Sequence, residues 1–356
     1  MNPQTTVTAH GGNILAIARQ RGCRPDQLID MSSNLTPLGP SRGLLQHLAA
    51  HLDQIGYLPE TDSATLRRLF AGRHRIPEAN ILAGNGTTEF IYAIPASLPF
   101  RKAVIVTPTY ADYFTACAWA QIPTESLAAG PDFRLDLGAL AATLKGGELV
   151  FLCNPNNPTG ALTGSDTLRS FIAGHPETCF VVDESYIAFT HEPSLLDGDL
   201  PANCHLLVSY SKVYGIPGLR LGFLVSDADN IRQIGRKARP WGVNRLAQLA
   251  GEYLMEHGDA IRAEVLAAID RERPRLMRGL AAMANLRLIP GSTHFLLCRL
   301  TSAMTAATLR ERLLDHDIII RDCANFIGLD GSYFRISLKQ RAENDRLLAA
   351  LATLLA

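Results

Sequence analysis

The chain has 356 residues, of which 47% are hydrophobic and 19% are charged, so it can bury a large core and is neither disordered nor fibrous. Its 34 Lys and Arg residues balance 34 Asp and Glu residues, and this formal net charge of zero gives no electrostatic reason to bind nucleic acid or an anionic membrane. No apolar run approaches the roughly 20 residues of a membrane span and the start lacks the blocks of a signal peptide, so we expect a cytoplasmic protein with small-molecule partners.

Residues 1–40 are expected to form an arm rather than part of a regular layer. They contain His10, Gly11 and Gly12, a helical stretch that ends near Arg21, and a loop rich in Ser, Asn, Pro and Gly over residues 32–41. An arm of this kind packs against another part of the molecule. We place it near the C-terminal domain and the functional site.

A large domain is predicted at residues 41–240, because short apolar runs alternate there with helical stretches. This pattern is typical of a parallel sheet with helices on both faces, which makes the fold class α/β. Ligands bind beyond the carboxyl ends of the strands in such sheets, and almost every apolar run here ends in Pro, Asn, Asp or Ser. The predicted strands are residues 103–106, 149–153, 180–183, 206–209 and 220–225.

The first candidate ligands follow the early part of this domain. A Gly-Asn-Gly-Thr-Thr-Glu segment starts at Gly84 and opens a helix, so Gly86 and Thr87 could offer free backbone N–H groups to a phosphate. A plain turn with a threonine cap explains the same residues. Tyr110 lies just past the 103–106 strand, where its ring would either stack on a cofactor ring or pack in the core.

Polar residues also follow the next two strands. Asn157 lies in the segment Asn-Pro-Asn-Asn-Pro-Thr-Gly, which is too unusual for a mere turn although its prolines and glycine do make one. Asp183 ends an apolar strand, and the phenol of Tyr186 follows three residues later. An isolated Asp at such a place is often a helix cap or a turn residue.

The segment at residues 209–220, Ser-Tyr-Ser-Lys-Val-Tyr-Gly-Ile-Pro-Gly-Leu-Arg, is the most informative. It places the lone Lys212 between hydroxyl side chains at the end of a strand, with glycines that permit a tight loop. A lysine sheltered in this way can lose its proton and attack an aldehyde, whereas an isolated lysine is usually solvated. Ser209 and Arg220 could bind a phosphate.

A smaller α+β domain is predicted at residues 241–356, where the pattern changes to long helices. We expect helices at 246–257, 261–284 and 342–355, and short strands around 293–298 and 333–338. The seven cysteines are scattered, and no pair has the spacing of a zinc or redox site. We expect reduced thiols in the core and no metal.

Together the candidate residues fit pyridoxal phosphate, which has an aldehyde, a phosphate and a ring nitrogen. Asp183 fits the carboxylate that pairs with the ring nitrogen and keeps it protonated, because the protonated ring is the electron sink that stabilises a carbanion. Tyr186 and Asn157 could reach the ring hydroxyl oxygen.

The sequence also resembles a known group, the fold-type I pyridoxal phosphate enzymes of the aminotransferase class, which includes the histidinol-phosphate aminotransferases. A narrower resemblance, nearly end to end, is to the L-threonine-O-3-phosphate decarboxylases of cobalamin biosynthesis. Its discriminating parts are the His-Gly-Gly-Asn opening at His10 and the Arg-Asp-Cys-Ala-Asn block at Arg321. Residues 32–39, 215–222 and 240–244 match as well.

This resemblance implies a fold and a role for each matching position. It implies the fold-type I transferase architecture, a covalent bond between Lys212 and the cofactor, and a homodimer in which Tyr57 reaches the cofactor phosphate of the partner subunit. Arg335 matches the arginine that forks onto the substrate carboxylate. The other implied ligands are Gly86, Thr87, Ser209 and Arg220 for the cofactor phosphate, and His10, Gly11, Gly12, Asn34, Asn157 and Arg321 for the substrate.

Two enzyme hypotheses follow. The first is decarboxylation of L-threonine O-3-phosphate to (R)-1-amino-2-propanol O-2-phosphate, with O-phosphoserine as a variant substrate. The two substrates differ by one methyl group, worth only about 1–3 kcal/mol in a pocket, and no motif chooses between them. The second is a histidinol-phosphate aminotransferase, which does not explain the His-Gly-Gly-Asn opening. Tyr186 is closer to the aminotransferase pattern, since such decarboxylases commonly have Phe there.

A third hypothesis is a non-catalytic module that uses the same fold, such as the sensing half of a transcription regulator. It predicts an appended DNA-binding domain and a basic face. Neither is expected in a chain of zero formal charge that the enzyme fold fills.

Overall fold

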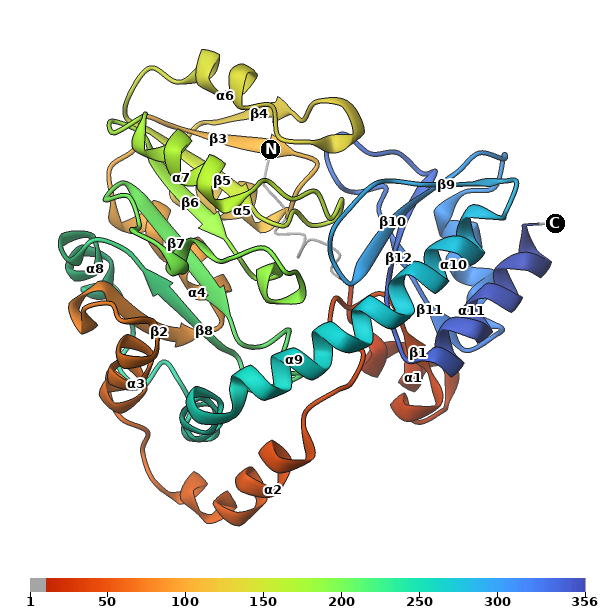
Figure 1. Ribbon diagram of the computed structural model, residues 1–356, viewed down its shortest axis with the longest axis horizontal. Coiled ribbons are helices and arrows are strands. Elements are labelled where there is room, and N and C mark those ends of the chain that lie inside the picture. Colours follow the sequence, from red (N-terminus) through yellow and green to blue (C-terminus); the bar gives the residue numbers. More distant parts are fainter. Residues whose placement is uncertain (1–10, 356) are drawn as a thin grey trace.

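A seven-stranded sheet organises the larger part of the chain (Figure 1). The structure, a computed structural model, describes residues 11–355, so His10 lies outside the described residues. β8 runs antiparallel to both of its neighbours and the other pairs are parallel, which confirms the mostly parallel α/β sheet. The strand order is β2 (Ile81–Asn85), β8 (Leu221–Val225), β7 (Cys204–Ser209), β6 (Cys179–Asp183), β5 (Glu148–Cys153), β3 (Lys102–Thr107) and β4 (Thr124–Ala128).

Helices cover both faces of this sheet, because successive strand residues point to opposite sides. In β6, Phe180 and Val182 belong to one apolar cluster and Val181 belongs to another. The five strands predicted for this sheet are confirmed, because each matches an observed strand to within two residues at either end. The first cluster packs under α3 (Ala64–His74), α6 (Leu137–Thr143) and α7 (Ser165–Ala173), and the second packs under α4 (Thr87–Ser97), α5 (Asp112–Trp119) and α8 (Ala228–Gly235).

One 37-residue helix, α9 (Arg245–Ala281), runs from the large sheet to the C-terminal part (Figure 1). The two helices predicted at 246–257 and 261–284 are thus a single helix, and the break expected between them is wrong. Gly258 lies within this helix, where the absence of a side chain allows close packing: a Cβ at this position would lie 2.8 Å from Oη of Tyr214. The helix starts after Asn244, whose side chain accepts a hydrogen bond from the N–H of Ala247.

The C-terminal part contains a four-stranded antiparallel sheet, and the N-terminal arm lies against it. In the arm, α1 (Ile14–Arg21) precedes β1 (Ile29–Asp30), which pairs in parallel with β11 (Ile318–Ile319). Further along, α2 (Arg42–Ala50) contacts α9. The four-stranded sheet has the order β12 (Arg321–Asp322), β13 (Tyr333–Ser337), β10 (Phe295–Leu300) and β9 (Leu286–Leu288), with α10 (Ala306–Leu314) and α11 (Arg341–Leu354) beside it.

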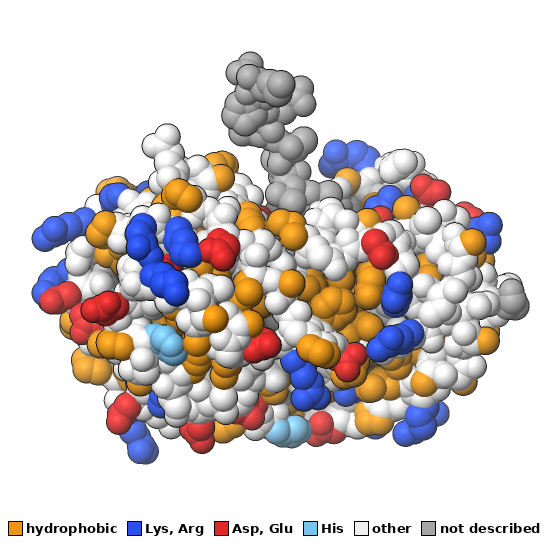
Figure 2. Space-filling model, turned by 90° about the horizontal axis from the view of Figure 1, so that it is seen from above, with side chains coloured by type: hydrophobic (Ala, Val, Ile, Leu, Met, Phe, Trp, Pro, Cys, Tyr) orange, Lys and Arg blue, Asp and Glu red, His pale blue; other side chains and the backbone are white. Residues whose placement is uncertain are grey.

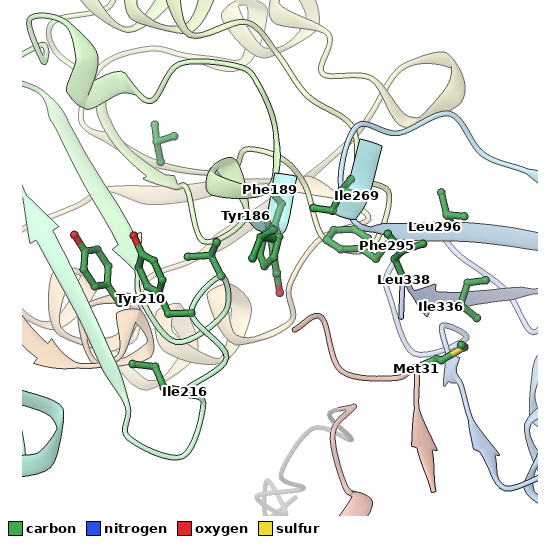
Figure 3. Packing of buried hydrophobic residues seen from close by; sticks show 14 of the residues in the cluster. Met31, Tyr186, Phe189, Tyr210, Ile216, Ile269, Phe295, Leu296, Ile336 and Leu338 are labelled. Carbon is green, nitrogen blue, oxygen red and sulfur yellow. The ribbon is translucent and has the colours of Figure 1, made fainter. Parts of the chain in front are cut away.

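The apolar core is continuous between the two sheets. Figure 3 shows Tyr210 on the side of the large sheet, Tyr186 near the middle, and Phe295 and Ile336 on the side of the small sheet. Met31 of the arm belongs to the same cluster. This core therefore fixes the arm and the small sheet beside the carboxyl ends of β6 and β7.

Charged side chains of both signs are interspersed on the face shown in Figure 2. Between residues 11 and 355, no helix is both long and apolar enough to cross a bilayer. The same range holds no cluster of three or more His, Cys, Asp or Glu side chains suited to a metal ion. All seven cysteines are free thiols.

Candidate active site

Two adjoining cavities lie at the carboxyl ends of the parallel strands. The inner cavity has a volume of about 150 Å³ and is lined by the start of α4 and the ends of β6 and β7. The outer cavity, of about 360 Å³, is lined mainly by the arm and by residues near the small sheet. Tyr110, Asn157, Tyr186 and Lys212 line both cavities. A ligand in one cavity would therefore meet a ligand in the other at Lys212.

One end of the inner cavity is suited to a phosphate. Among residues 11–355 no side chain caps the start of α4 at Thr87, so the N–H groups of its first turn can bind an anion. Gly86 has a φ of 75°, and a Cβ there would lie 2.6 Å from Nη2 of Arg220. Glycine thus allows the guanidinium to lie against the start of the helix. Arg220 itself has a φ of 62°, a strained value for a non-glycine residue, and Ser209 lines the same cavity.

Asp183 occupies another part of the inner cavity. Its Oδ2 accepts a 2.8 Å hydrogen bond from Oη of Tyr113, and its Oδ1 accepts a 2.9 Å bond from the N–H of Ser185. Burial raises the pKa of Asp183, whereas these hydrogen bonds and the nearby Lys212 act in the opposite direction. A buried carboxylate held by two donors is suited to pairing with a protonated ring nitrogen.

Lys212 lies at the junction of the two cavities. Burial lowers the pKa of Lys212 to about 8, the charges of Arg220 and Arg335 lower it as well, and Asp183 opposes them. Near neutral pH, a lysine with this lowered pKa has a much larger neutral fraction than an exposed lysine and can act as a nucleophile. The alternative of a solvated surface lysine does not describe this position.

Arg335 on β13 forms one wall of the outer cavity and is only 5% exposed. Its Nη1 donates to Oδ1 of Asn157, and its Nη2 donates to the carbonyl oxygen of Ser32 at 2.7 Å. Its Nε is buried and has no hydrogen-bond partner among the described residues. A buried guanidinium with a donor to spare fits an anionic group such as a carboxylate.

Arg321 of β12, which pairs with Arg335 of β13, lines the outer cavity together with the arm. Nη2 of Arg321 donates to Oδ1 of Asn325 at 2.7 Å, and the guanidinium lies 5.3 Å from the ring centre of Phe326. Gly11 and Gly12 line the same cavity. A second cation in the same cavity as Arg335 would suit a ligand with two anionic groups.

Most of the residues singled out in the sequence come together around these cavities. Asn34 also lines the outer cavity, and its Oδ1 accepts a 2.9 Å hydrogen bond from Oγ of Ser337. Tyr57 does not reach either cavity within one chain, because its side chain is 68% exposed elsewhere. His10 falls among the residues that the structure does not describe.

Sequence reasoning missed Tyr113 and Asp30. Tyr113 is fully buried, holds Asp183 and stacks on Phe151 with ring centres 4.8 Å apart. Its position three residues after Tyr110 was the only signal, and a core aromatic gives the same pattern. Asp30 lines the outer cavity, and only the polar character of the following loop pointed toward it.

Comparisons with known proteins show the family of the chain. The family model described as aminotransferase class I and II matches residues 27–351. The threonine-phosphate decarboxylase of Salmonella typhimurium is 38% identical over 98% of this chain and 97% of its own. A histidinol-phosphate aminotransferase of Methanothermobacter thermautotrophicus is 31% identical over 97% of this chain and 93% of its own. The solved L-threonine-O-3-phosphate decarboxylase from Porphyromonas gingivalis has a TM-score of 0.84 and 31% identity over 92% of this chain and 99% of that chain.

Proposed function

The chain belongs to the aminotransferase class I and II family, and we propose that it is a pyridoxal phosphate-dependent decarboxylase of L-threonine O-3-phosphate. The product would be (R)-1-amino-2-propanol O-2-phosphate. The enzymes that the sequence resembles make this compound for the nucleotide loop of cobalamin. One observation carries the proposal: Lys212 lies where the two cavities meet. The inner cavity is suited to the cofactor, and the outer cavity contains two arginines. The similarity to threonine-phosphate decarboxylases over nearly the whole chain supports it.

The residues of the inner cavity fit pyridoxal phosphate. The start of α4, Ser209 and Arg220 would hold the phosphate, and Asp183 would pair with the ring nitrogen. The ring hydroxyl would meet Tyr186 and Asn157, and the ring of Tyr110 could stack on the cofactor. When bound at Lys212, the cofactor supplies an electron sink for the carbanion that forms at the α-carbon of the substrate.

The residues of the outer cavity would bind and orient the substrate. The N–H groups of Arg335 can bind the carboxylate in two parallel bonds, while Arg321 and the arm would hold the phosphate. Fixing both ends of the substrate determines which bond of the α-carbon is presented for cleavage, so the carboxylate leaves as carbon dioxide. Lys212 lines both cavities, and its Nζ would carry the proton that returns to this carbon.

The proposal includes a cytoplasmic homodimer with shared active sites. Tyr57 lies in a run of exposed apolar side chains that includes Leu52, Ile55 and Leu58, which is the character of an interaction surface. Across such an interface, Tyr57 of one subunit would reach the cofactor phosphate of the other. Nucleic acid and membranes are not expected partners.

We also propose the division into an arm at residues 1–40, a cofactor-binding domain at 41–240 and a small domain at 241–356. The pairing of β1 with β11 supports the place of the arm beside the small domain. The passage of α9 from one sheet to the other supports the last boundary.

A histidinol-phosphate aminotransferase is the second candidate, because Tyr186 matches its pattern and the cofactor residues are shared. Mass-resolved analysis of products from O-phospho-L-threonine and O-phospho-L-serine separates the two. We expect the holoenzyme to release carbon dioxide and the matching amine phosphate. Stoichiometric conversion of the cofactor to its amine form without carbon dioxide would reject decarboxylation.

The covalent link is tested by borohydride reduction of the holoenzyme followed by peptide mass spectrometry. The label should fall on Lys212, and Lys212→Ala should remove it together with the visible absorbance. Lys102→Ala is the control, because Nζ of Lys102 pairs with Glu125 away from both cavities. A label on another lysine would overturn the assignment.

A further inference from the structure

One acidic side chain, that of Asp30, lines the outer cavity among three basic ones, Lys212, Arg321 and Arg335. The proposed substrate carries a carboxylate and a phosphate, so a free carboxylate in this cavity would repel it. The position of Asp30 therefore needs a reason other than contact with the substrate.

The carboxylate of Asp30 accepts hydrogen bonds from nearby residues of its own chain. Its Oδ1 accepts hydrogen bonds from the N–H of Ser32 at 2.9 Å and from Oγ of Ser32 at 2.6 Å. Its Oδ2 accepts a bond from Oγ of Ser33 at 2.5 Å, and the N–H of Ser33 lies 3.3 Å from Oδ1. Hydrogen bonds to a charged acceptor are among the stronger ones in proteins, so this carboxylate fixes the turn at Ser32 and Ser33.

The turn at Ser32 and Ser33 is hydrogen-bonded to Arg335. The carbonyl oxygen of Ser32 accepts the 2.7 Å bond from Nη2 of Arg335, and Ser32 is only 3% exposed. The guanidinium is thus held by Asn157 on Nη1 and by Ser32 on Nη2. Burial lowers the pKa of Arg335, and Asp30 is one of the groups that act against this shift.

The same turn also contacts Gly11 and Gly12, the first described residues of the arm. The N–H of Gly12 donates to Oγ of Ser32 at 3.1 Å, and a Cβ on Gly11 would lie 2.7 Å from the carbonyl oxygen of Ser32. Asp30 itself is anchored because β1 pairs with β11, with Asp30 opposite Ile319. The turn thus links the first described residues of the arm to the small domain and to Arg335.

We propose that Asp30 is a positioning residue for the substrate, which acts by fixing the Ser32–Ser33 turn and, through the carbonyl of Ser32, the direction of Arg335. This inference rests on the proposed function, in which Arg335 binds the substrate carboxylate. Without the carboxylate of Asp30, Ser32 and Ser33 lose their shared acceptor and Nη2 of Arg335 loses a fixed partner. The affinity should then fall for ligands that carry a carboxylate.

The test compares the affinities of the Asp30→Ala holoenzyme for two ligands. Affinity for O-phospho-L-threonine, which has a carboxylate, should fall about tenfold or more, as expected for hydrogen bonds to a charged group. Affinity for (R)-1-amino-2-propanol O-phosphate, which has none, should change less than threefold, because Arg335 has no carboxylate to bind. Asp30→Asn keeps an acceptor and should recover part of the loss. Equal losses for the two ligands, or no loss, would overturn the proposal.

Action through Arg335 is tested by a double-mutant cycle. In an Arg335→Lys background, Asp30→Ala should change the KM for O-phospho-L-threonine less than twofold, because the guanidinium that it positions is gone. Additive effects of the two substitutions would show that Asp30 acts elsewhere. Asp26→Ala removes an exposed carboxylate from the same segment, which pairs with Arg24, and should match the wild-type enzyme.

Two further measurements keep the outcome decisive. If Asp30→Ala does not fold, Ser33→Ala removes the hydrogen bond from Oγ of Ser33 to Oδ2 of Asp30 and should show a smaller loss with the same preference between ligands. Affinities are read from the visible absorbance of the holoenzyme, and turnover is read from carbon dioxide. A wild-type enzyme that releases no carbon dioxide would reject the decarboxylase, while the two affinities would still decide the role of Asp30.

Discussion

The reactivity of Lys212 follows from its immediate surroundings. Its pKa of about 8, lowered by burial and by Arg220 and Arg335, makes the amine about one-tenth neutral at pH 7 and about nine-tenths neutral at pH 9. The rate at which pyridoxal phosphate bonds to the apoenzyme should therefore rise with pH, with a midpoint near 8, and level off above it. Stopped-flow absorbance measures this rate. A midpoint near 10.5, the ordinary value for lysine, would contradict the assigned environment.

Tyr113 should control the pKa of Asp183, the proposed partner of the ring nitrogen. Tyr113→Phe keeps the stacking on Phe151 but removes the hydrogen bond to Oδ2 of Asp183, so the pKa of Asp183 should rise further. The bond is made to a charged group and is worth roughly 1.5–3 kcal/mol, so we expect kcat to fall about tenfold or more. Carbon dioxide release and the pH dependence of cofactor absorbance measure the effect.

The control for this substitution is Tyr92→Phe. Tyr92 is a partly buried tyrosine on α4 whose ring lies against Trp119 outside both cavities. It should leave kcat within twofold of the wild-type value. An unchanged Tyr113→Phe enzyme would show that Ser185 alone suffices to hold Asp183.

At the scale of single elements, α9 shows why a helix can contain glycine. A Cβ at Gly251 would lie 2.6 Å from Cδ1 of Leu66, which is fully buried. Although alanine favours helices, Gly251→Ala should lower the free energy of unfolding by about 1–2 kcal/mol, because the tight contact outweighs helix propensity. Gly72→Ala in α3 has nothing within 4 Å of its Cβ and should stabilise the protein slightly. Urea denaturation compares them, and a stabilised Gly251→Ala protein would contradict the packing.

The elements that could be predicted from the sequence are those whose own residues determine them. β5 and β6 are buried on both faces and form short apolar runs, so their positions were clear. β4 is an edge strand with mostly exposed residues and gives no such pattern. Gly258 in α9 suggests a break by local pattern, whereas its close approach to Tyr214 is a tertiary contact that local pattern does not contain.

The same distinction applies to the site in the whole molecule. Parallel strands bring their carboxyl ends to one edge, so Asp183, Asn157 and Lys212 could be placed together from the sequence. The contact of Arg335 with Ser32 joins residues far apart in the chain, and no local spacing predicts it. The resemblance supplied the role of Arg335, whereas only the packing of the arm on the small domain reveals the part of Asp30.

Assembly is the last property that one chain cannot show by itself, and Tyr57 provides its test. Leu58→Glu places a charge in the exposed apolar run, where Leu58 is 77% exposed, and should convert the expected dimer to monomers. Tyr57→Phe should leave the dimer intact and weaken cofactor affinity several-fold, because only the phenol is lost.

Sedimentation velocity and cofactor titration separate these two effects. Trp119→Glu, at a residue that is 70% exposed on α5, should alter neither quantity. If the wild-type protein is a fully active monomer, the exposed run has another purpose and the cofactor phosphate is held by one chain alone. If Tyr57→Phe binds cofactor as well as the wild-type dimer does, the two subunits associate without sharing their sites.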